Sequence, residues 1–450
     1  MRNNSINKLG SIEESIRQTL TTIFYNQHKT NSFITVNEEA LMIAKVLDQE
    51  LQAGKLLSDF HGKPVAIKDL IHTNGIETTM GSKIYENFFP DEDATIIRSL
   101  KGAGAIVIGK THTHELAYGP LGDRSFVGPC FNPHNPRKIT GGSSSGSAAA
   151  VGAGLVDYAI GTDTGGSIRI PASACGVVGM KPTFGLVSKK GVQDLAYSLD
   201  HVGPITSTVL DNAKLLNVLA GFDSGDPYSL MIKAKDYTSL IGNDIKDKVI
   251  GVPFHLLDPI QDEVKESFGK AIKMLKDLGA IVKEVTIKHL DEIKWAQEIT
   301  IQAEAAEIHK ENFENHKDLM DSEVYERLSA SRNVKAYEYI RAQQIRSRLT
   351  SRYNKIFEEV SILFLPTLPI LPPDIGQREI ILNGETKSVR QLLLSLTSPT
   401  NLTGNPSLSI PGEPSRQGLP IGLQLISKHG NEEVLYQFAH ALERKIKDGR

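Results

Sequence analysis

Cysteine is scarce in this chain, which has only Cys130 and Cys175 among its 450 residues. So few cysteines exclude a disulfide framework and favour a reducing compartment. The sequence also lacks any run of about 18 consecutive apolar residues, so it predicts no transmembrane helix. Its N-terminus lacks the apolar segment of a signal peptide. We therefore expect a cytoplasmic protein that does not contact the membrane.

Neither sign of charge dominates the sequence. Lys and Arg number 50 against 53 Asp and Glu, which gives a net charge of −3. A balanced chain has no overall field for nucleic acid or for an anionic membrane surface, so we expect neither as a partner. What is abundant is ordinary, because hydrophobic residues make up 40% and are sufficient for a large core. The expected partner is a small molecule bound at a local site, and the composition leaves a homodimer open.

The order of apolar patterns along the chain predicts an α/β fold. Short apolar runs alternate with helical patterns between residues 60 and 210, which is typical of a sheet whose loops carry the site. Helical periodicity dominates residues 211–360, with one strand expected near residue 281. Apolar runs return in residues 361–450, which indicates that the chain rejoins the sheet.

Two clusters of glycine and serine stand out, GGSSSGS at residues 141–147 and GTDTGGS at 161–167. Glycine lets backbone N–H groups approach a ligand, and serine supplies a hydroxyl that can attack or relay a proton. The first cluster formally fits the G-x-S-x-G nucleophile elbow with Ser144 as nucleophile, but a polar, proline-broken segment precedes it instead of a buried strand. A phosphate-binding loop is also disfavoured, because no lysine follows Gly146.

The second cluster places Ser167 after two glycines, so the N–H groups of residues 164–167 could converge on an oxyanion. The alternative is a glycine-rich turn in which serine caps a helix. Upstream, Lys68 ends the apolar run PVAIK, where burial is expected. Burial disfavours the charged ammonium, so a neutral Lys68 could act as a general base. The alternative is a lysine that reaches from a strand end into solvent.

Together, PVAIKD at residues 64–69, GGSSSGSAAAVGAGL at 141–155 and GTDTGGSIRIPASACGVVGMKPTFGLVS at 161–188 resemble the amidase signature family of serine hydrolases. The lysine stands 75 residues before Ser143, which stands 24 residues before Ser167, and both spacings match the family. Flanking segments agree across nearly the whole chain. The resemblance therefore implies a single amidase domain over residues 1–450, with one large twisted mixed sheet covered by helices on both faces.

The resemblance implies a Ser-Ser-Lys triad and no cofactor or metal. Ser167 would be the nucleophile that becomes the acyl-ester, Ser143 the bridging serine after a cis peptide bond, and Lys68 the base that receives the proton through Ser143. The backbone N–H groups expected to form the oxyanion hole are those of Thr164, Gly165, Gly166 and Ser167.

Three further residues are expected to support the loop, namely Asp163, Arg169 and Ser144. The chain departs from the family at Ser145, where the usual motif GGSSGGS has glycine. If that glycine takes a positive φ, Ser145 would be strained or the turn would differ.

The substrate is expected to contact the loop at residues 117–121 and two later positions; the candidates are Tyr118, Gly119, Leu121, Leu394 and Arg346. In the related glutaminase of tRNA-dependent amidotransferases, their A subunit, which releases ammonia from glutamine, an acidic residue grips the glutamine amino group where this chain has Leu394. An apolar side chain cannot make that ion pair. Arg346 matches an arginine that can hold a substrate carboxylate. The sequence favours hydrolysis of a small, uncharged amide or carbamate, and the glutaminase of a tRNA-dependent amidotransferase is the alternative.

An alternative of another class rests on His112 and His114, which follow a strand-like run. On an extended segment the two side chains point the same way, as a metal-dependent amidohydrolase would require. Surface histidines in a loop are the simpler interpretation, because the other histidines show no ligand-like spacing.

Overall fold

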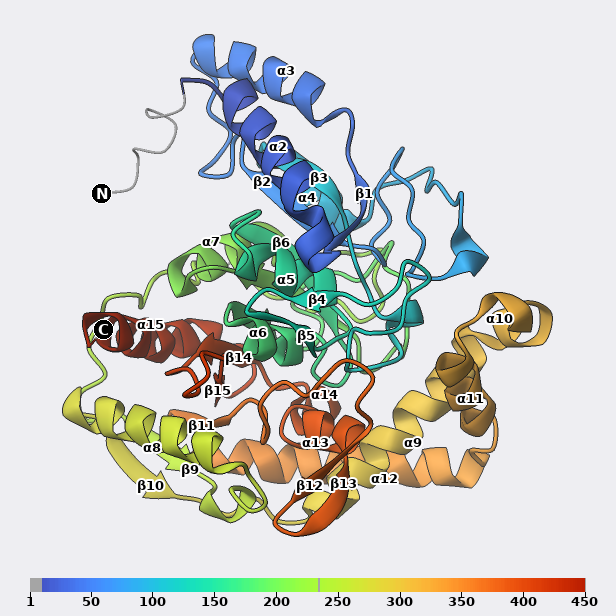
Figure 1. Cartoon of the computed structure of the whole chain (residues 1–450). Coiled ribbons are helices and arrows are strands. Elements are labelled where there is room, and N and C mark those ends of the chain that lie inside the picture. Colours follow the sequence, from blue (N-terminus) through green and yellow to red (C-terminus); the bar gives the residue numbers. More distant parts are fainter. Residues whose placement is uncertain (1–9, 234, 450) are drawn as a thin grey trace.

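A computed structural model describes residues 10–233 and 235–449. Its main feature is an eleven-stranded sheet with the order β1-β3-β2-β6-β8-β7-β14-β15-β11-β9-β10 (Figure 1). The strands of this sheet are β1 (Phe33–Val36), β2 (Pro64–Lys68), β3 (Ile106–Thr111), β6 (Tyr158–Asp163), β7 (Val178–Lys181), β8 (His201–Thr206), β9 (Val249–Val252), β10 (Ile281–Glu284), β11 (Ile362–Pro366), β14 (Ser407–Pro411) and β15 (Gly422–Ile426).

The sheet is parallel toward its two ends and antiparallel in the middle. Strand β2 pairs in parallel with β3 and β6, and β9 pairs in parallel with β10 and β11. Antiparallel pairs connect β6 to β11 through β8, β7, β14 and β15. The mixed α/β sheet predicted from the sequence is confirmed. Segments 60–210, 211–360 and 361–450 all contribute strands, and β9 is a strand that the sequence did not predict.

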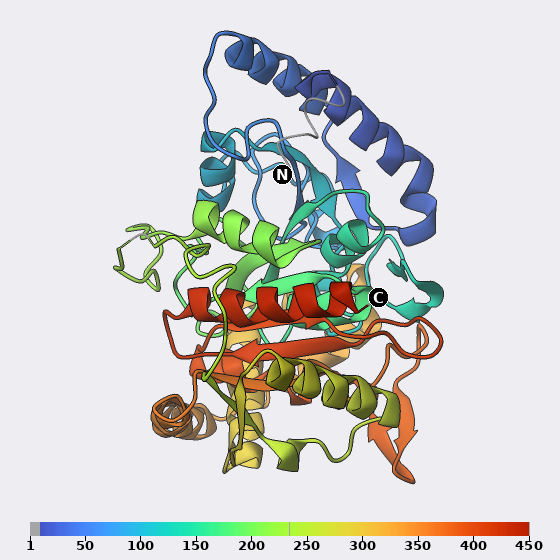
Figure 2. The ribbon, with the colours of Figure 1, turned by 90° about the vertical axis from the view of Figure 1, so that its left-hand side faces the viewer.

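Helices cover both faces because the strand side chains alternate. Val65 and Ile67 of β2 pack in one core with α4, α7, α8 and α15, whereas Ala66 packs in a second core with α2, α3 and α5. Figure 2 shows α15 crossing the sheet, with α2 and α3 at one end of the molecule. These helices, with the neighbouring α6, are α2 (Ile12–Thr30), α3 (Ala40–Gln52), α4 (Thr95–Gly102), α5 (Ser145–Gly152), α6 (Arg169–Cys175), α7 (Val209–Leu219), α8 (Asp262–Asp277) and α15 (Glu432–Asp448).

A separate helical group stands beside the sheet (Figure 1). Two long helices pack against each other and bury apolar side chains against Leu363 and Leu365 of β11. The helices of this region are α9 (Leu290–Ile308), α10 (Lys310–Asn315), α11 (Ser322–Ser331), α12 (Ala336–Ile356), α13 (Val389–Ser395) and α14 (Pro399–Thr403). Two small hairpins complete the fold, β4 (Phe131–Asn132) with β5 (Asn135–Ile139) and β12 (Glu379–Leu382) with β13 (Glu385–Ser388).

Single-turn 3-10 helices occur in four connections, at Lys83–Tyr85, Glu115–Ala117, Phe254–Leu256 and Lys317–Leu319. Cys130 and Cys175 are both free and buried, as the sequence predicts. Within the described ranges, we find no helix long and apolar enough to cross a membrane.

Candidate active site

Lys68 ends β2 with its side chain fully buried. Its Nζ donates to Ser143 Oγ at 2.7 Å and to Thr162 Oγ1, on the neighbouring strand β6, also at 2.7 Å. Burial lowers the pKa of Lys68 to about 7, although the negative charges of Asp200 and Asp163 oppose the shift. The interpretation of Lys68 as a solvent-reaching lysine is therefore wrong, and much of its population is neutral near pH 7.

Ser143 lies on a loop that is held from two sides. The Gly142–Ser143 peptide bond is cis, as the resemblance implies. The Ser143 carbonyl accepts from the His114 N–H at 3.1 Å, and the Gly142 N–H donates to the Pro120 carbonyl at 2.8 Å. The loop at residues 117–121 thus directly supports the residue that precedes Ser143.

Ser167 lies in the turn between β6 and α6, where its side chain is 7% exposed. Within the part of the chain that the structure describes, the Ser167 hydroxyl has no hydrogen-bond partner. Its carbonyl accepts from the Ser144 N–H at 3.2 Å, so the two Gly/Ser clusters lie side by side. The structure therefore brings Lys68, Ser143 and the Ser167 loop together, as the sequence predicts.

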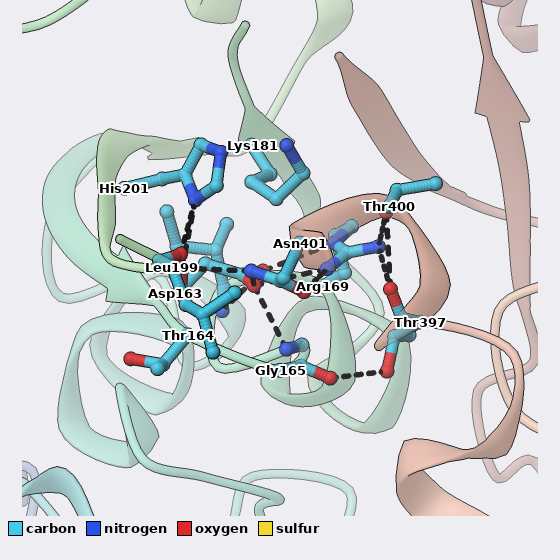
Figure 3. A network of polar contacts seen from close by, with 12 residues as sticks. Asp163, Thr164, Gly165, Arg169, Lys181, Leu199, His201, Thr397, Thr400 and Asn401 are labelled. Atoms are coloured by element: carbon cyan, nitrogen blue, oxygen red, sulfur yellow. Dashed lines mark hydrogen bonds and ion pairs between the residues drawn. The ribbon is translucent and has the colours of Figure 1, made fainter. Parts of the chain in front are cut away.

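The Asp163 carboxylate organises the Ser167 loop (Figure 3). It accepts from the backbone N–H of Gly166 at 2.8 Å and of Ile168 at 3.1 Å. Arg169 donates to both of its oxygens, at 3.0 and 2.9 Å. Burial would raise the pKa of Asp163, but the Arg169 charge and hydrogen bonds outweigh it, so the pKa lies well below its usual range. Asp163 is therefore a permanent anion inside the protein.

Arg169 is fully buried and connects this loop to segments more than 200 residues later. Its Nη2 also donates to Asn401 Oδ1 at 2.7 Å, and Asn401 Nδ2 returns a bond to Asp163 at 2.8 Å. Its Nη1 donates to the Thr397 carbonyl at 2.8 Å, to Thr400 Oγ1 at 2.7 Å and to Gln424 Oε1 at 2.8 Å. All three nitrogens of the guanidinium group therefore have protein acceptors.

The expected oxyanion hole needs one correction. The Gly166 N–H already donates to Asp163, so it does not point toward a substrate. Gly165 and Ser167 are better candidates, because within residues 10–233 and 235–449 their N–H groups have no acceptor. Thr164 stays a candidate, and its hydroxyl donates to the buried Asp200 at 2.5 Å.

Ser144 and Ser145 both have structural contacts. Ser144 Oγ donates to the Thr162 carbonyl at 3.1 Å and accepts from the Thr162 N–H at 3.2 Å, so Ser144 supports the loop as predicted and is poorly placed to be a nucleophile. Ser145 begins α5 and does not have a positive φ, so the expected strain does not arise. Its hydroxyl lies 2.8 Å from Nδ1 of His112, a ring whose Nε2 lies 2.8 Å from the Gly128 carbonyl.

The tautomer of His112 follows from these contacts. A carbonyl oxygen can only accept, so Nε2 carries the proton and Nδ1 accepts from the Ser145 hydroxyl. Burial lowers the pKa of His112 to about 4, which keeps the ring neutral. Ser145 thus satisfies a buried imidazole nitrogen, and this contact explains a serine where the family has glycine.

The metal-site alternative loses its ligand pair in this structure. The His112 ring contacts Ser145 and Gly128, and His114 Nδ1 accepts from the Gly122 N–H at 3.3 Å. Both histidines are fully buried, not on the surface as the simpler interpretation had it. Among the described residues, no group of three or more His, Cys, Asp or Glu side chains could hold a metal ion.

Leu394 is the predicted substrate residue that lies closest to the Ser167 loop. Its Cδ2 is 3.2 Å from the position that a Cβ atom on Gly165 would take. Arg346 lies elsewhere, with Nε donating to the Leu402 carbonyl at 2.8 Å and both Nη atoms donating to Ser198. Those contacts attach α12 to neighbouring loops and engage the guanidinium group with protein acceptors.

The loop at residues 117–121 contributes less open surface than expected. Leu121 is fully buried in an apolar cluster with Ile170 and Leu393, so its assignment as a substrate contact is wrong. Gly119 packs against the His114 ring, where a Cβ atom would clash. Tyr118 is 2% exposed, and its hydroxyl lies 2.8 Å from Ser331 Oγ.

Sequence reasoning missed several residues that hold the Ser167 loop. Asn401 and Gln424 bind Arg169, and Gln297 Nε2 donates to the Thr164 carbonyl at 2.9 Å. These residues lie between 130 and 257 positions from the loop, and no local pattern connects them to it. Only the buried charge pair of Asp163 and Arg169 signals that such polar partners must exist.

Comparison with known proteins gives a consistent result over nearly the whole chain. The sequence profile of the amidase family matches residues 14–436. The A subunit of glutamyl-tRNA(Gln) amidotransferase from Geobacillus thermodenitrificans strain NG80-2 is 38% identical over 464 residues, covering 96% of this chain and 94% of that protein. The crystal structure of the same subunit from Thermotoga maritima has a TM-score of 0.82 at 34% identity, covering 96% of this chain and 91% of that one.

A further solved structure is described as a vestigial protein complex that reveals the evolutionary origins of an s-triazine catabolic enzyme. It has a TM-score of 0.93 at 30% identity, covering 96% of this chain and 95% of that one.

Proposed function

This chain belongs to the amidase signature family of carbon–nitrogen hydrolases, and from that premise we propose that it cleaves a small amide or carbamate through a serine acyl-enzyme. One observation carries the proposal. A fully buried Lys68, whose pKa burial lowers to about 7, contacts Ser143 at 2.7 Å beside the Ser167 loop. A neutral amine in that position can accept a proton from a serine hydroxyl.

In the proposed reaction, Ser167 Oγ attacks the carbonyl carbon of the amide. Its proton passes to Ser143 Oγ, and the Ser143 proton passes to Lys68 Nζ. A bond forms between oxygen and carbon, and the negative charge that develops on the carbonyl oxygen is stabilised by the N–H groups of Gly165 and Ser167. The carbon–nitrogen bond then breaks, and the leaving nitrogen takes the proton from Lys68 through Ser143.

A water molecule completes the proposed cycle. It attacks the acyl-ester carbon while Ser143 and Lys68 again remove a proton, and the Ser167 oxygen leaves with a proton returned by the same route. The products are a carboxylic acid and the free amine or ammonia. Asp163 and Arg169 do not exchange protons in this scheme, because their ion pair holds the loop in place.

The acyl group is proposed to lack a positive charge near the reacting carbon. Leu394 lies against Gly165 at the Ser167 loop and cannot pair with an ammonium group. This observation favours simple amides or carbamates over an α-amino acid amide.

Glutamine is the second candidate substrate, and the relatives support it more directly than Leu394 supports the first. The A subunit of glutamyl-tRNA(Gln) amidotransferase is 38% identical to this chain over nearly its full length. That protein is named as one subunit of several, so this candidate also places the chain in an assembly with other subunits.

The test is a panel of amides, carbamates and esters, including glutamine, assayed on the wild type, Ser167→Ala and Ser144→Ala. We expect Ser167→Ala to lose roughly 10⁴- to 10⁶-fold in kcat for every substrate that the wild type hydrolyses. Ser144→Ala is the matched control, and its loss should be much smaller because Ser144 only supports the loop. Equal losses in the two variants, or full activity in Ser167→Ala, would overturn the mechanism.

A further inference from the structure

Helix α13 carries a second residue on the face that presents Leu394. Arg390 stands four positions earlier in Val389–Ser395, and residues four apart lie on the same face of a helix. The two positions are about 6 Å apart along the helix axis. Because Leu394 contacts the Ser167 loop at Gly165, Arg390 lies about one helical turn further from the reacting atoms.

Arg390 has no partner for its charge. Its Nε is buried and makes no hydrogen bond within residues 10–233 and 235–449. The nearby arginines differ from Arg390 in this respect, because each has a carboxylate partner: Arg327 with Glu323, Arg378 with Asp123 and Glu323, and Arg124 with Asp321 and Glu323. An arginine guanidinium stays charged in proteins, so one unpaired cation is left over in this group.

Arg390 acts on the loop that supports the bridging serine. Arg327 Nη1 donates to the Tyr118 carbonyl, and its guanidinium carbon lies 5.4 Å from the centre of the Tyr118 ring. Burial, followed by the charge of Arg390, lowers the pKa of Arg327, which indicates that the two cations are close. The same loop accepts the Gly142 N–H at Pro120. Arg390 therefore lies between the Tyr118 loop and the Leu394 face of α13.

We propose that Arg390 determines substrate specificity by binding a carboxylate of the substrate, at a distance of about one helical turn from the amide carbon. A guanidinium group with a buried, unpartnered N–H matches a carboxylate, which can accept two parallel hydrogen bonds. The substrate class is then a small amide that carries a carboxylate, such as the monoamide of a dicarboxylic acid.

This inference rests on the proposed function and changes one part of it. The sequence predicts an uncharged substrate because Leu394 replaces an acid, and Leu394 indeed excludes only a positive group. Arg390 adds a requirement for a negative group further along the molecule. Glutamine carries both charges, whereas glutaramate carries only the negative one, so glutaramate fits both residues.

The experiment compares glutaramate with the neutral pentanamide in wild type, Arg390→Met and Arg390→Lys. We expect the wild type to prefer glutaramate by roughly 10- to 100-fold in kcat/KM, as for a charge-assisted hydrogen bond. In Arg390→Met the ratio should fall to about one, and in Arg390→Lys part of the preference should return. Arg416→Met, which removes an exposed arginine elsewhere, should leave the ratio unchanged.

A second arm locates the carboxylate. N-Acetyl-β-alanine carries it on the leaving amine, and N-propylacetamide is the neutral counterpart. A preference that depends on Arg390 in this pair, but not in the glutaramate pair, would place the carboxylate on the amine side. A ratio near one in both pairs, or a preference that Arg390→Met leaves intact, would overturn the inference.

Failure of the proposed function gives a different result. If no amide is hydrolysed, binding of glutaramate to Ser167→Ala is measured by calorimetry, with and without Arg390→Met. Loss of at least 10-fold in affinity on removing Arg390 supports the carboxylate site even then, and equal affinities contradict it. Thermal unfolding of each variant shows whether it is folded, and Arg390→Lys repeats the test if Arg390→Met is not.

Discussion

Arg169 and Arg390 show how differently this protein treats two regions around one reaction centre. Arg169 lies behind the Ser167 loop, fully buried, and all three of its nitrogens donate to protein acceptors. Arg390 lies on the Leu394 face of α13 and leaves a buried N–H without a partner. A group that the protein satisfies internally can hold a loop but cannot recruit a ligand. The unsatisfied group is the one available to a substrate.

The inner region is costly to build and therefore rigid. Asp163 and Arg169 are both removed from water, and their attraction offsets the desolvation only because Asn401 and backbone groups complete the hydrogen bonds. A network of this kind fails as a whole when one member is lost. The outer region contains exposed or half-buried groups, so single changes there should affect substrate choice more than folding.

The largest expected effect is from breaking the inner network with Arg169→Met. Removing the guanidinium leaves Asp163 buried without its cation, which should cost about 3–5 kcal/mol in the free energy of unfolding. Urea denaturation measures the change, with Arg416→Met as a surface control expected to stay within about 0.5 kcal/mol. Arg169→Lys should not restore stability, since an ammonium cannot reproduce the planar contacts. A loss below about 1 kcal/mol would mean that the inner region is no more cooperative than the outer one.

The next effect is the pH dependence of Lys68, which belongs to the inner region. Burial lowers its pKa to about 7, and only the neutral amine can accept the Ser143 proton. Below that pH the protonated fraction grows, so kcat/KM should fall about tenfold per pH unit from pH 7 downward and be level above pH 8. Arg390 keeps its charge throughout, so the preference for glutaramate should stay constant between pH 6 and 9. A flat kcat/KM from pH 8 to pH 5 would exclude Lys68 as the base.

The same division explains which features the sequence could predict. Lys68, Ser143 and Ser167 lie in contiguous motifs with fixed spacing, so the sequence alone placed them together, and the structure places the first two at 2.7 Å. The engagement of the Gly166 N–H by Asp163 was missed because it depends on the shape of a four-residue turn. Gln424 reaches Arg169 from a distant strand, which no local pattern reveals.

Errors outside the motifs have similar physical causes. Ser145 was expected to be strained because the sequence could not show that α5 begins there. Leu121 was assigned to the substrate from its place in a loop, but that loop is covered by α13 and the residue is core. Strand β9 has only four residues and was therefore not distinguished from its helical surroundings.

The smallest expected effect tests the outer region through Leu394→Asp, which restores an acidic group beside Gly165. The side chain is partly buried at a site that adjoins solvent, so its attraction to the glutamine ammonium should be worth about 1 kcal/mol, or roughly a fivefold gain in kcat/KM for glutamine relative to pentanamide. Leu394→Asn has the same shape without the charge and is the matched control, which should show no such gain. Stability should change little in either variant, because Leu394 is not part of the Asp163–Arg169 network. If Leu394→Asp instead destabilised the protein as strongly as Arg169→Met does, α13 would belong to the rigid inner region, and the distinction between holding groups and substrate-selecting groups would fail at this helix.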